Sequence, residues 1–160
     1  MEIEKKFSIK TLPSNLEQFE CIHIEQGYLC RGPIVRIRKA NEDYILTYKS
    51  KTKLNEEKFG TRISNEVELP LSEQAYNHLK EKIDGSLIVK DRYKIPYEDG
   101  RTIELDIFHG YLEGLRFAEV EFDSVEQIQE FSVPDWFEED VSMDTRYSNS
   151  YLSSIDRWVD

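Results

Sequence analysis

The sequence contains few of the residues that cross-link or interrupt small domains. It has two cysteines, five prolines and seven glycines among 160 residues. Two cysteines, Cys21 and Cys30, are too few for a disulfide framework, so we expect free thiols in a reducing compartment. No apolar run approaches the roughly 20 residues that a membrane-spanning helix needs, and the opening residues MEIEKKF lack the apolar stretch of a signal peptide. We therefore expect a cytoplasmic protein with no membrane segment.

An excess of basic residues is also missing. Thirty-two Asp and Glu against 21 Lys and Arg give a formal net charge of -11, whereas proteins that bind nucleic acids or anionic membranes are usually basic. Neither partner is expected. Hydrophobic residues make up 39% of the chain, with eight Phe and nine Tyr, which is enough to bury a core and excludes a disordered protein. The length predicts a single domain over residues 1–160.

The sequence does have a long series of stretches in which apolar and polar residues alternate. A period of two is typical of antiparallel strands, and it predicts strands at 2–9, 22–31, 34–40, 43–50, 62–69, 87–97, 101–108 and 116–123. Helices are predicted at 13–20, 72–83, 124–131 and 144–156, with Ser72 as an N-cap and Ser124 with Gln127 as a capping box. So many short strands favour a barrel or a tightly curled sheet over a layered α/β fold.

The charged residues of these strands share one face, and neighbours on that face often have the same sign. Arg36 and Arg38 flank apolar Ile37, and Glu119 and Glu121 flank Val120. A sheet face that simply meets water is the common alternative. Such a face normally mixes signs, because like charges two residues apart repel, and it carries more Ser, Thr, Asn and Gln than these strands do.

If the sheet closes on itself, the charged faces line a tunnel. Its carboxylates would be Glu2, Glu4, Glu66, Glu68, Glu104, Asp106, Glu119 and Glu121, and its cations Lys6, Arg36, Arg38, Lys49, Lys90, Arg92 and Lys94. Clustered carboxylates suit Mg²⁺ or Mn²⁺, and clustered Arg and Lys suit phosphate oxygens. A cavity that offers both predicts a polyanion that carries its own metal, and a triphosphate is the natural candidate.

The motifs of these strands resemble those of the CYTH superfamily, the triphosphate tunnel metalloenzymes, in the same order from residue 2 to about 152. Glu2-Ile3-Glu4-Lys5-Lys6 has the ExExK form of the family's first strand. The further matches are Gln26-Gly27-Tyr28-Leu29, Val35-Arg36-Ile37-Arg38, Leu46-Thr47-Tyr48-Lys49, Glu66-Val67-Glu68, Lys90-Asp91-Arg92-Tyr93, Glu104-Leu105-Asp106, Glu119-Val120-Glu121-Phe122 and Arg146-Tyr147-Ser148-Asn149. The sequence departs from the family at Glu138, where relatives often have Gly, and at Ser142, where they often have Thr.

The resemblance implies an α+β fold, a closed eight-stranded antiparallel β-barrel that forms a tunnel with helices packed outside. It implies Mg²⁺ or Mn²⁺ as the cofactor, with Glu2, Glu4, Asp106, Glu119 and Glu121 as metal ligands. The triphosphate would be bound by Lys6, Arg36, Arg38, Lys49, Lys90, Arg92 and Arg146. The expected catalytic residues are Glu2 or Glu4, which would orient and deprotonate the attacking water, and Lys6, which would contact the leaving or terminal phosphate. Glu66, Glu68 and Glu104 would balance the cations.

The predicted function is divalent-metal-dependent hydrolysis of a triphosphate. Inorganic tripolyphosphate is the preferred substrate, because the short chain leaves little room for a base-recognition extension. The tunnel motifs do not distinguish this activity from a class IV-like adenylyl cyclase, which makes cyclic AMP from ATP, or from a thiamine triphosphatase. A non-enzymatic module that binds polyphosphate or nucleotides is the alternative of another class. The partner is in each case a small-molecule triphosphate, and a homodimer is left open.

The remaining reactive residues form no recognised motif. His23, His78 and His109 are scattered, and Cys21 and Cys30 lack the spacing of metal ligands. We predict polar or structural histidines and inert thiols. No P-loop and no GxGxxG occurs, which fits a phosphate group held by side chains rather than by backbone amides.

Overall fold

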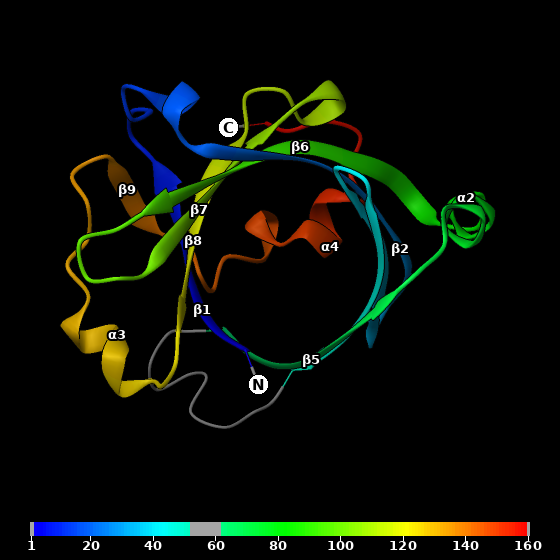
Figure 1. The fold of residues 1–160 in the computed structure, drawn as a ribbon, viewed down its shortest axis with the longest axis horizontal. Coiled ribbons are helices and arrows are strands. Elements are labelled where there is room, and N and C mark those ends of the chain that lie inside the picture. The colour runs from blue at the N-terminus through cyan, green and yellow to red at the C-terminus, as the bar shows by residue number, and fades with distance from the viewer. Residues whose placement is uncertain (1, 52–61, 160) are drawn as a thin grey trace.

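The computed structural model describes residues 2–51 and 62–159 and shows a closed barrel of antiparallel strands (Figure 1). The strands are β1 (Glu2–Ile9), β2 (Glu20–Arg31), β3 (Ile34–Ala40), β4 (Asp43–Lys51), β5 (Arg62–Pro70), β6 (Asp84–Pro96), β7 (Thr102–Phe108), β8 (Arg116–Phe122) and β9 (Phe137–Asp140). Their order is β5-β4-β3-β2-β6-β7-β8-β1-β9, and a further pairing of β5 with β1 closes the ring. The predicted eight-stranded antiparallel barrel is confirmed, with β9 as an additional strand outside it.

The first strand forms the seam of the barrel. One edge of β1 pairs with β8 from Ile3 to Ser8. The other edge is divided, because only residues 2–4 pair with β5, while Phe7 and Ile9 pair with β9. Strand β9 was not predicted, since its sequence FEED shows no alternation of apolar and polar residues.

The helical segments are shorter than the sequence predicts. They are the α-helices α2 (Glu73–Lys80), α3 (Glu126–Glu130) and α4 (Asn149–Leu152) and the 3₁₀ turns η1 (Leu16–Gln18), η2 (Gly110–Leu112) and η3 (Thr145–Tyr147). The helices predicted at 13–20 and 144–156 are therefore wrong in extent. Asn15 adopts a left-handed conformation, which a continuous helix over 13–20 cannot contain. The extended conformation of Ser148 divides the second segment into η3 and α4.

Helix capping follows the prediction at α2 but not at α3. The Ser72 side chain accepts a hydrogen bond from the Ala75 backbone N–H at 3.1 Å, as an N-cap residue should. The capping box predicted at Ser124 does not form. Helix α3 begins at Glu126, and the Gln127 side chain instead accepts from the Asp123 N–H at 3.0 Å.

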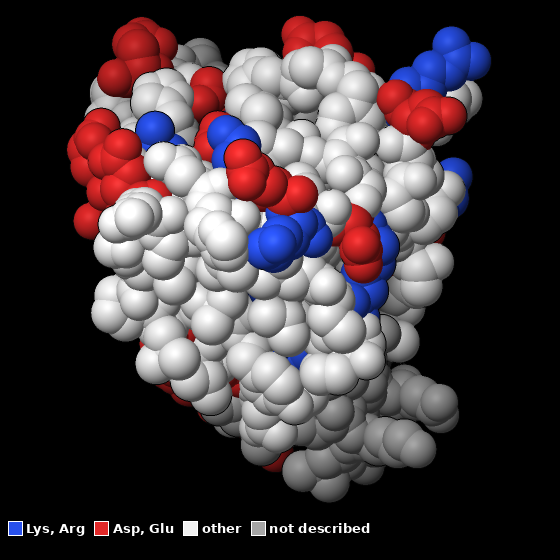
Figure 2. All heavy atoms as spheres, turned by 90° about the vertical axis from the view of Figure 1, so that its right-hand side faces the viewer, with Lys and Arg blue, Asp and Glu red and all other residues white. Residues whose placement is uncertain are grey.

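The main hydrophobic core lies outside the barrel, on the outer face of β1, β7 and β8. Ile3, Phe7 and Ile9 of β1 are buried there with residues of β7 and β8, and α3, β9 and η1 cover this face (Figure 1). Helix α2 lies on the opposite side of the barrel. Around α2, Figure 2 shows basic side chains beside acidic ones, so this outer surface mixes signs. In the described part of the chain, every helix is too short or too polar to cross a membrane.

A second core fills part of the barrel's interior. It consists of buried apolar residues from β2, β6, β7, β8, the η2 region and α4, namely Tyr28, Ile88, Phe108, Leu112, Leu115, Phe117 and Leu152. Helix α4 lies within the ring of strands rather than outside it (Figure 1). We call residues 145–153, which include η3 and α4, the C-terminal plug.

The guanidinium of Arg31 anchors this plug to the barrel wall. It donates hydrogen bonds to the Ser150 carbonyl (3.2 Å), to Ser153 Oγ (2.9 Å) and to the Asp84 carbonyl (2.8 Å). Gly85 allows the close approach, since a Cβ there would lie 2.2 Å from the Ser153 carbonyl oxygen, and its φ of +79 is in the region that favours glycine. Sequence periodicity alone did not show that the chain's last segment turns inward.

Candidate active site

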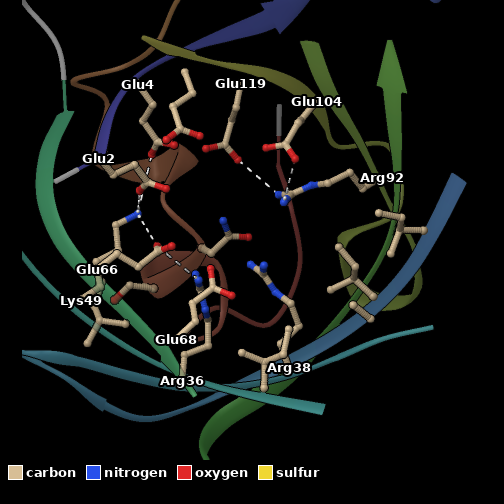
Figure 3. Close-up of a pocket in the computed structure, with 18 of the residues that line it drawn as sticks. Glu2, Glu4, Arg36, Arg38, Lys49, Glu66, Glu68, Arg92, Glu104 and Glu119 are labelled. Atoms are coloured by element: carbon tan, nitrogen blue, oxygen red, sulfur yellow. Dashed lines mark hydrogen bonds and ion pairs between the residues drawn. The ribbon is translucent and has the colours of Figure 1, made fainter. Parts of the chain in front are cut away.

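The barrel encloses a charged cavity of about 420 Å³ (Figure 3). Its charged lining consists of Glu2, Glu4, Arg36, Arg38, Lys49, Glu66, Glu68, Arg92, Lys94, Glu104, Glu119 and Glu121. An apolar strip of β2, β3 and β4 residues, which includes Ile22, Ile24 and Ile45, lines another part, and Asn149 and Ser150 of the plug complete the wall. The structure thus turns the like-signed strand faces inward, where the sequence argument expected them.

Four carboxylates gather on the β1–β8 side of the cavity. Glu2 and Glu4 come from β1, and Glu119 and Glu121 come from β8, with Glu4 directly opposite Glu121 in the register. Burial, followed by the charge of Glu119, raises the pKa of Glu4 to about 8. Burial and the neighbouring Glu2 also raise the pKa of Glu121. Like charges placed opposite one another destabilise a sheet.

These carboxylates fit a divalent metal ion. Their environment disfavours further negative charge, and a cation among them would relieve the repulsion. Carboxylate oxygens are the ligands that Mg²⁺ and Mn²⁺ prefer. Both the donor set and the raised pKa values of Glu4 and Glu121 therefore agree with a bound hard cation.

Two arginines on β3 face this acidic side across the cavity (Figure 3). Arg36 is buried, its Nη2 lies 3.9 Å from Glu66 Oε2, and its Nε has no hydrogen-bond partner among the described residues. Arg38 Nε donates to Gln26 Oε1 at 3.0 Å. Burial, then the charges of Arg36 and Arg92, lower the pKa of Arg38 to about 9. Crowded guanidinium groups, one of them with an Nε that is unpaired in the described part of the chain, suit the oxygens of an anion.

Lys49 and Arg92 connect the acidic and basic sides. Lys49 Nζ lies 2.5 Å from Glu2 Oε1 and 3.8 Å from Glu66 Oε2. Arg92 lies 3.5 Å from Glu119 and 3.6 Å from Glu104. Both cations therefore adjoin carboxylates and reach into the cavity, where a ligand could contact them.

Two lysines lie fully buried beside the plug and are not part of the cavity lining. Lys6 Nζ donates to the Tyr147 carbonyl at 2.7 Å and lies 4.2 Å from the centre of the Phe117 ring. Lys90 Nζ donates to Asn149 Oδ1 at 3.2 Å and pairs with a buried aspartate at 2.8 Å. Burial lowers the pKa of Lys90 to about 7, although the aspartate opposes this shift. These two lysines were expected to contact the triphosphate, but here their ammonium groups hold the plug.

Two further predicted site residues are not part of the cavity lining. Asp106 is fully buried beneath it, where its oxygens accept from Arg92 at 2.8 and 2.9 Å and pair with Lys90, and the charge of Glu119 acts on it. Arg146 is 58% exposed and pairs with Asp144 at 2.8 Å. Asp144 also caps η3, which keeps the guanidinium of Arg146 at the surface and outside the cavity lining.

Sequence reasoning left several residues that line the cavity or support its lining out of the candidate site. Lys94 shares the inner face of Arg92, and this alternation was a signal for it. Gln26 lies in the second-strand motif and orients Arg38. In the motif at 146–149, the side chain that reaches the barrel interior is that of Asn149, not that of Arg146. Ser150 had no sequence signal, because its place depends on the plug entering the barrel.

A closed barrel with a charged interior is the architecture of one class of enzymes, and comparison with known proteins identifies that class. The chain belongs to the CYTH superfamily of triphosphate tunnel metalloenzymes, among the inorganic triphosphatases. It is 33% identical over 155 residues to an inorganic triphosphatase of Nitrosomonas europaea, covering 95% of this chain and 96% of the relative. It is 35% identical over 159 residues to one of Acetivibrio thermocellus, covering 94% and 92%.

Solved structures agree with this assignment. A crystal structure of an inorganic triphosphatase superposes with a TM-score of 0.71 at 30% identity and covers 99% of this chain and 97% of that one. A Hippeastrum protein proposed to be an adenylyl cyclase, and reported to have a dominant triphosphatase activity, has a TM-score of 0.58 at 18% identity and covers 81% and 83%. The second likeness shows the fold alone. No protein-family model matches the chain.

Proposed function

We propose that this chain hydrolyses a terminal phosphoanhydride bond of inorganic tripolyphosphate with the help of Mg²⁺ or Mn²⁺. The observation that carries the proposal is the incomplete pairing of the buried Arg36 opposite a group of repelling carboxylates. A polyanion bound together with a cation would satisfy both sides at once. The activity named for the two relatives supports tripolyphosphate as the substrate.

The carboxylates of Glu2, Glu4, Glu119 and Glu121 would hold the metal. When bound, a divalent cation acts as a Lewis acid on phosphoryl oxygens. Burial alone would raise the pKa of Glu119, but the charges of Lys6 and Arg92 lower it well below its usual range. We therefore assign Lys6 a positioning role: it keeps Glu119 ionised from beneath the cavity instead of contacting phosphate.

The cations that line the cavity would bind the phosphate oxygens. Arg36, Arg38, Lys49, Arg92 and Lys94 can neutralise the charge that develops on the transferred group and on the leaving oxygen. Asp106 fixes the plane of Arg92 through two hydrogen bonds, which orients its guanidinium before the substrate arrives.

Glu2 or Glu4 would orient the attacking water and accept its proton. Both carboxylates line the cavity, and whichever of the two does not coordinate the metal could accept the proton of the water.

A matched assay tests the proposal. Tripolyphosphate, ATP and thiamine triphosphate are supplied separately with Mg²⁺ or Mn²⁺, and both phosphate and cyclic AMP are measured. The apolar strip at Ile22, Ile24 and Ile45 is the reason to include substrates with an organic group. Rapid phosphate release from tripolyphosphate with little from ATP supports the proposal. Cyclic AMP from ATP would replace it with the cyclase, and tight triphosphate binding without turnover would replace it with a binding module.

A cytoplasmic location and the lack of a nucleic-acid partner stay predictions. Whether the chain forms a homodimer is left open. Light scattering on the purified chain measures its mass in solution and decides between monomer and dimer.

A further inference from the structure

A cluster of cysteine, histidine and aspartate side chains lies on the outer face of the barrel, away from the charged cavity. Cys21 and His23 are two residues apart on β2, and Asp91 lies on β6 directly opposite His23. His109 follows the end of β7. The neighbours of Asp91 in the chain, Lys90 and Arg92, face the interior, so Asp91 faces outward. Sequence spacing did not suggest this cluster, because only the pairing of β2 with β6 brings it together.

The side chains are close enough to share a ligand. One donor atom each of Cys21, His23 and Asp91 lies within 4.8 Å of the other two. His23 Nδ1 is 2.5 Å from Asp91 Oδ1, and His109 Nε2 is 2.9 Å from Asp91 Oδ2. His109 therefore orients the carboxylate from its far side. Among the described residues, the only ion pairs of Asp91 are those with the two histidines.

We infer that Cys21, His23 and Asp91 form a binding site for a borderline-soft divalent cation of the zinc type. A thiolate, an imidazole and a carboxylate are the three ligand types that proteins use for Zn²⁺, whereas the tunnel offers the oxygen ligands that Mg²⁺ and Mn²⁺ prefer. A hydrogen-bonded outer partner such as His109 is typical of metal ligands, because it fixes their orientation. Water would occupy the fourth position.

The surroundings favour a cation at this place. Asp91 lies beside both Cys21 and His23, and its negative charge would attract a metal ion. A groove of about 350 Å³ that reaches His23 and Asp91 gives access from outside. The other charged groups at the groove are Lys39, Lys90, Glu25 and Glu42. Tyr93 hydrogen-bonds Cys21. The bound ion would link β2 to β6 across the wall of the barrel.

Cobalt titration of the full-length chain tests this site. Co²⁺ is added in the presence of saturating Mg²⁺, which occupies oxygen sites, and the thiolate-to-cobalt charge-transfer absorption is recorded. Cys21 and Cys30 are the only thiols in the sequence. We expect one equivalent of Co²⁺ to produce the band, Zn²⁺ to displace it, and Cys21→Ser to abolish it. The matched controls Cys30→Ser and His78→Ala should keep it.

Two further variants show whether the geometry is the one described. His23→Gln, at a side chain that is 75% exposed and thus safe for folding, should weaken Co²⁺ binding strongly. His109→Ala should weaken it about 10- to 100-fold, as loss of an outer partner usually does. Zn²⁺ should raise the Tm of the parent and not that of Cys21→Ser. A missing charge-transfer band, or one that survives Cys21→Ser, would overturn the inference.

This inference stands apart from the proposed function. Cys21→Ser should hydrolyse tripolyphosphate at the parental rate, since Cys21 is outside the cavity lining. A chain that binds Co²⁺ through Cys21 and lacks hydrolysis would refute the proposed function alone. An active chain without the band would refute the outer site alone.

Discussion

Among single residues, Arg36 combines a cost to the fold with a benefit to binding. Its guanidinium is buried, and its Nε lacks a partner among the described residues. Arg36→Met removes the charge and keeps much of the volume. We expect kcat/KM for tripolyphosphate to fall about 10²- to 10³-fold, the usual cost of one lost preorganised donor. The Tm should be equal to or higher than that of the parent, because an apolar side chain often replaces a poorly paired buried charge without loss.

Lys39→Met on the same strand is the matched control for Arg36, since Lys39 is not part of the tunnel lining. It should keep near-parental kcat/KM. Similar losses in both variants would show that general electrostatics of β3, and not contact with substrate, explains the effect.

The carboxylate Glu119 should control the response to metal. Glu119→Gln removes a charge that Lys6 and Arg92 hold in the ionised form. We expect activity to require far more Mg²⁺ or Mn²⁺ and to remain low at saturation, and chelation by EDTA to abolish the parental activity. Metal titrations of the rate measure both, with the exposed Glu138→Gln as control. An unchanged metal requirement in Glu119→Gln would remove it from the ligand set.

The alternation of residues predicted whether a strand side chain faces the interior or the outside, but not its hydrogen-bond and ion-pair partners. Arg36 and Arg38 face inward as the alternation indicated, because a period of two is a local property of a strand. Asp106 also faces inward, yet its partners are Arg92 and Lys90, which the register of β6 with β7 selects. Pairing between strands is decided by the whole barrel, so the partners of buried charges could not be read from single strands.

At the level of elements, β9 depends on a hydrogen-bonded corner at Asp140. Asp140 Oδ1 accepts from Ser142 N–H at 2.9 Å and from Ser142 Oγ at 2.6 Å. Ser142 Oγ accepts in turn from the Lys6 N–H at 2.9 Å. Lys5 pairs with the other oxygen of Asp140 at 2.5 Å. The hydroxyl group of Ser142 therefore makes the hydrogen bonds of this corner, at the position where the sequence departs from the family's usual threonine.

The stability lost when Asp140 is replaced should depend on pH in a defined direction. Burial alone would raise the pKa of Asp140, but Lys5 and Ser142 lower it. A carboxylate whose pKa is lower in the folded than in the unfolded state stabilises the fold at pH values above its unfolded pKa of about 4. This stabilisation is lost as the pH falls through the folded-state pKa. Asp140→Asn should therefore lower the Tm at pH 7, and the gap to the parent should narrow below about pH 4. Thermal melts across this range measure it, and a constant gap would contradict the assignment.

Strand β9 and the plug also mark where elements could not be predicted. Periodicity identified all eight barrel strands, because most of them have an apolar face and a charged face; β2 differs, since its Ile22 and Ile24 line the cavity. The polar FEED segment pairs with β1 only because β5 leaves that edge free. The plug enters the barrel because Arg31 and Gly85 receive it. Both depend on surfaces that exist only after the barrel has formed.

For the whole molecule, a ring of repelling side chains implies that ligands stabilise the fold. Tripolyphosphate alone, without a divalent cation, should raise the Tm of the parent by relieving the crowding of Arg36, Arg38 and Arg92. The Tm shift should grow with tripolyphosphate concentration. A ligand that binds only the folded state adds about 2.7 kcal/mol to the free energy of unfolding at a hundredfold excess over Kd. Arg36→Met should show a much smaller shift. Equal shifts in parent and variant would place the binding outside the tunnel.

The seam at β1 has a consequence for how the protein is made. Strand β1 is synthesised early, but its partner strands β8 and β9 lie more than 100 residues further along the chain. Contacts between such distant parts of a chain form slowly, because the loop must first be ordered. The carboxylates and arginines of the proposed site come together only when the ring has closed. Under the proposed function, capture of metal and polyphosphate would therefore report that folding is complete.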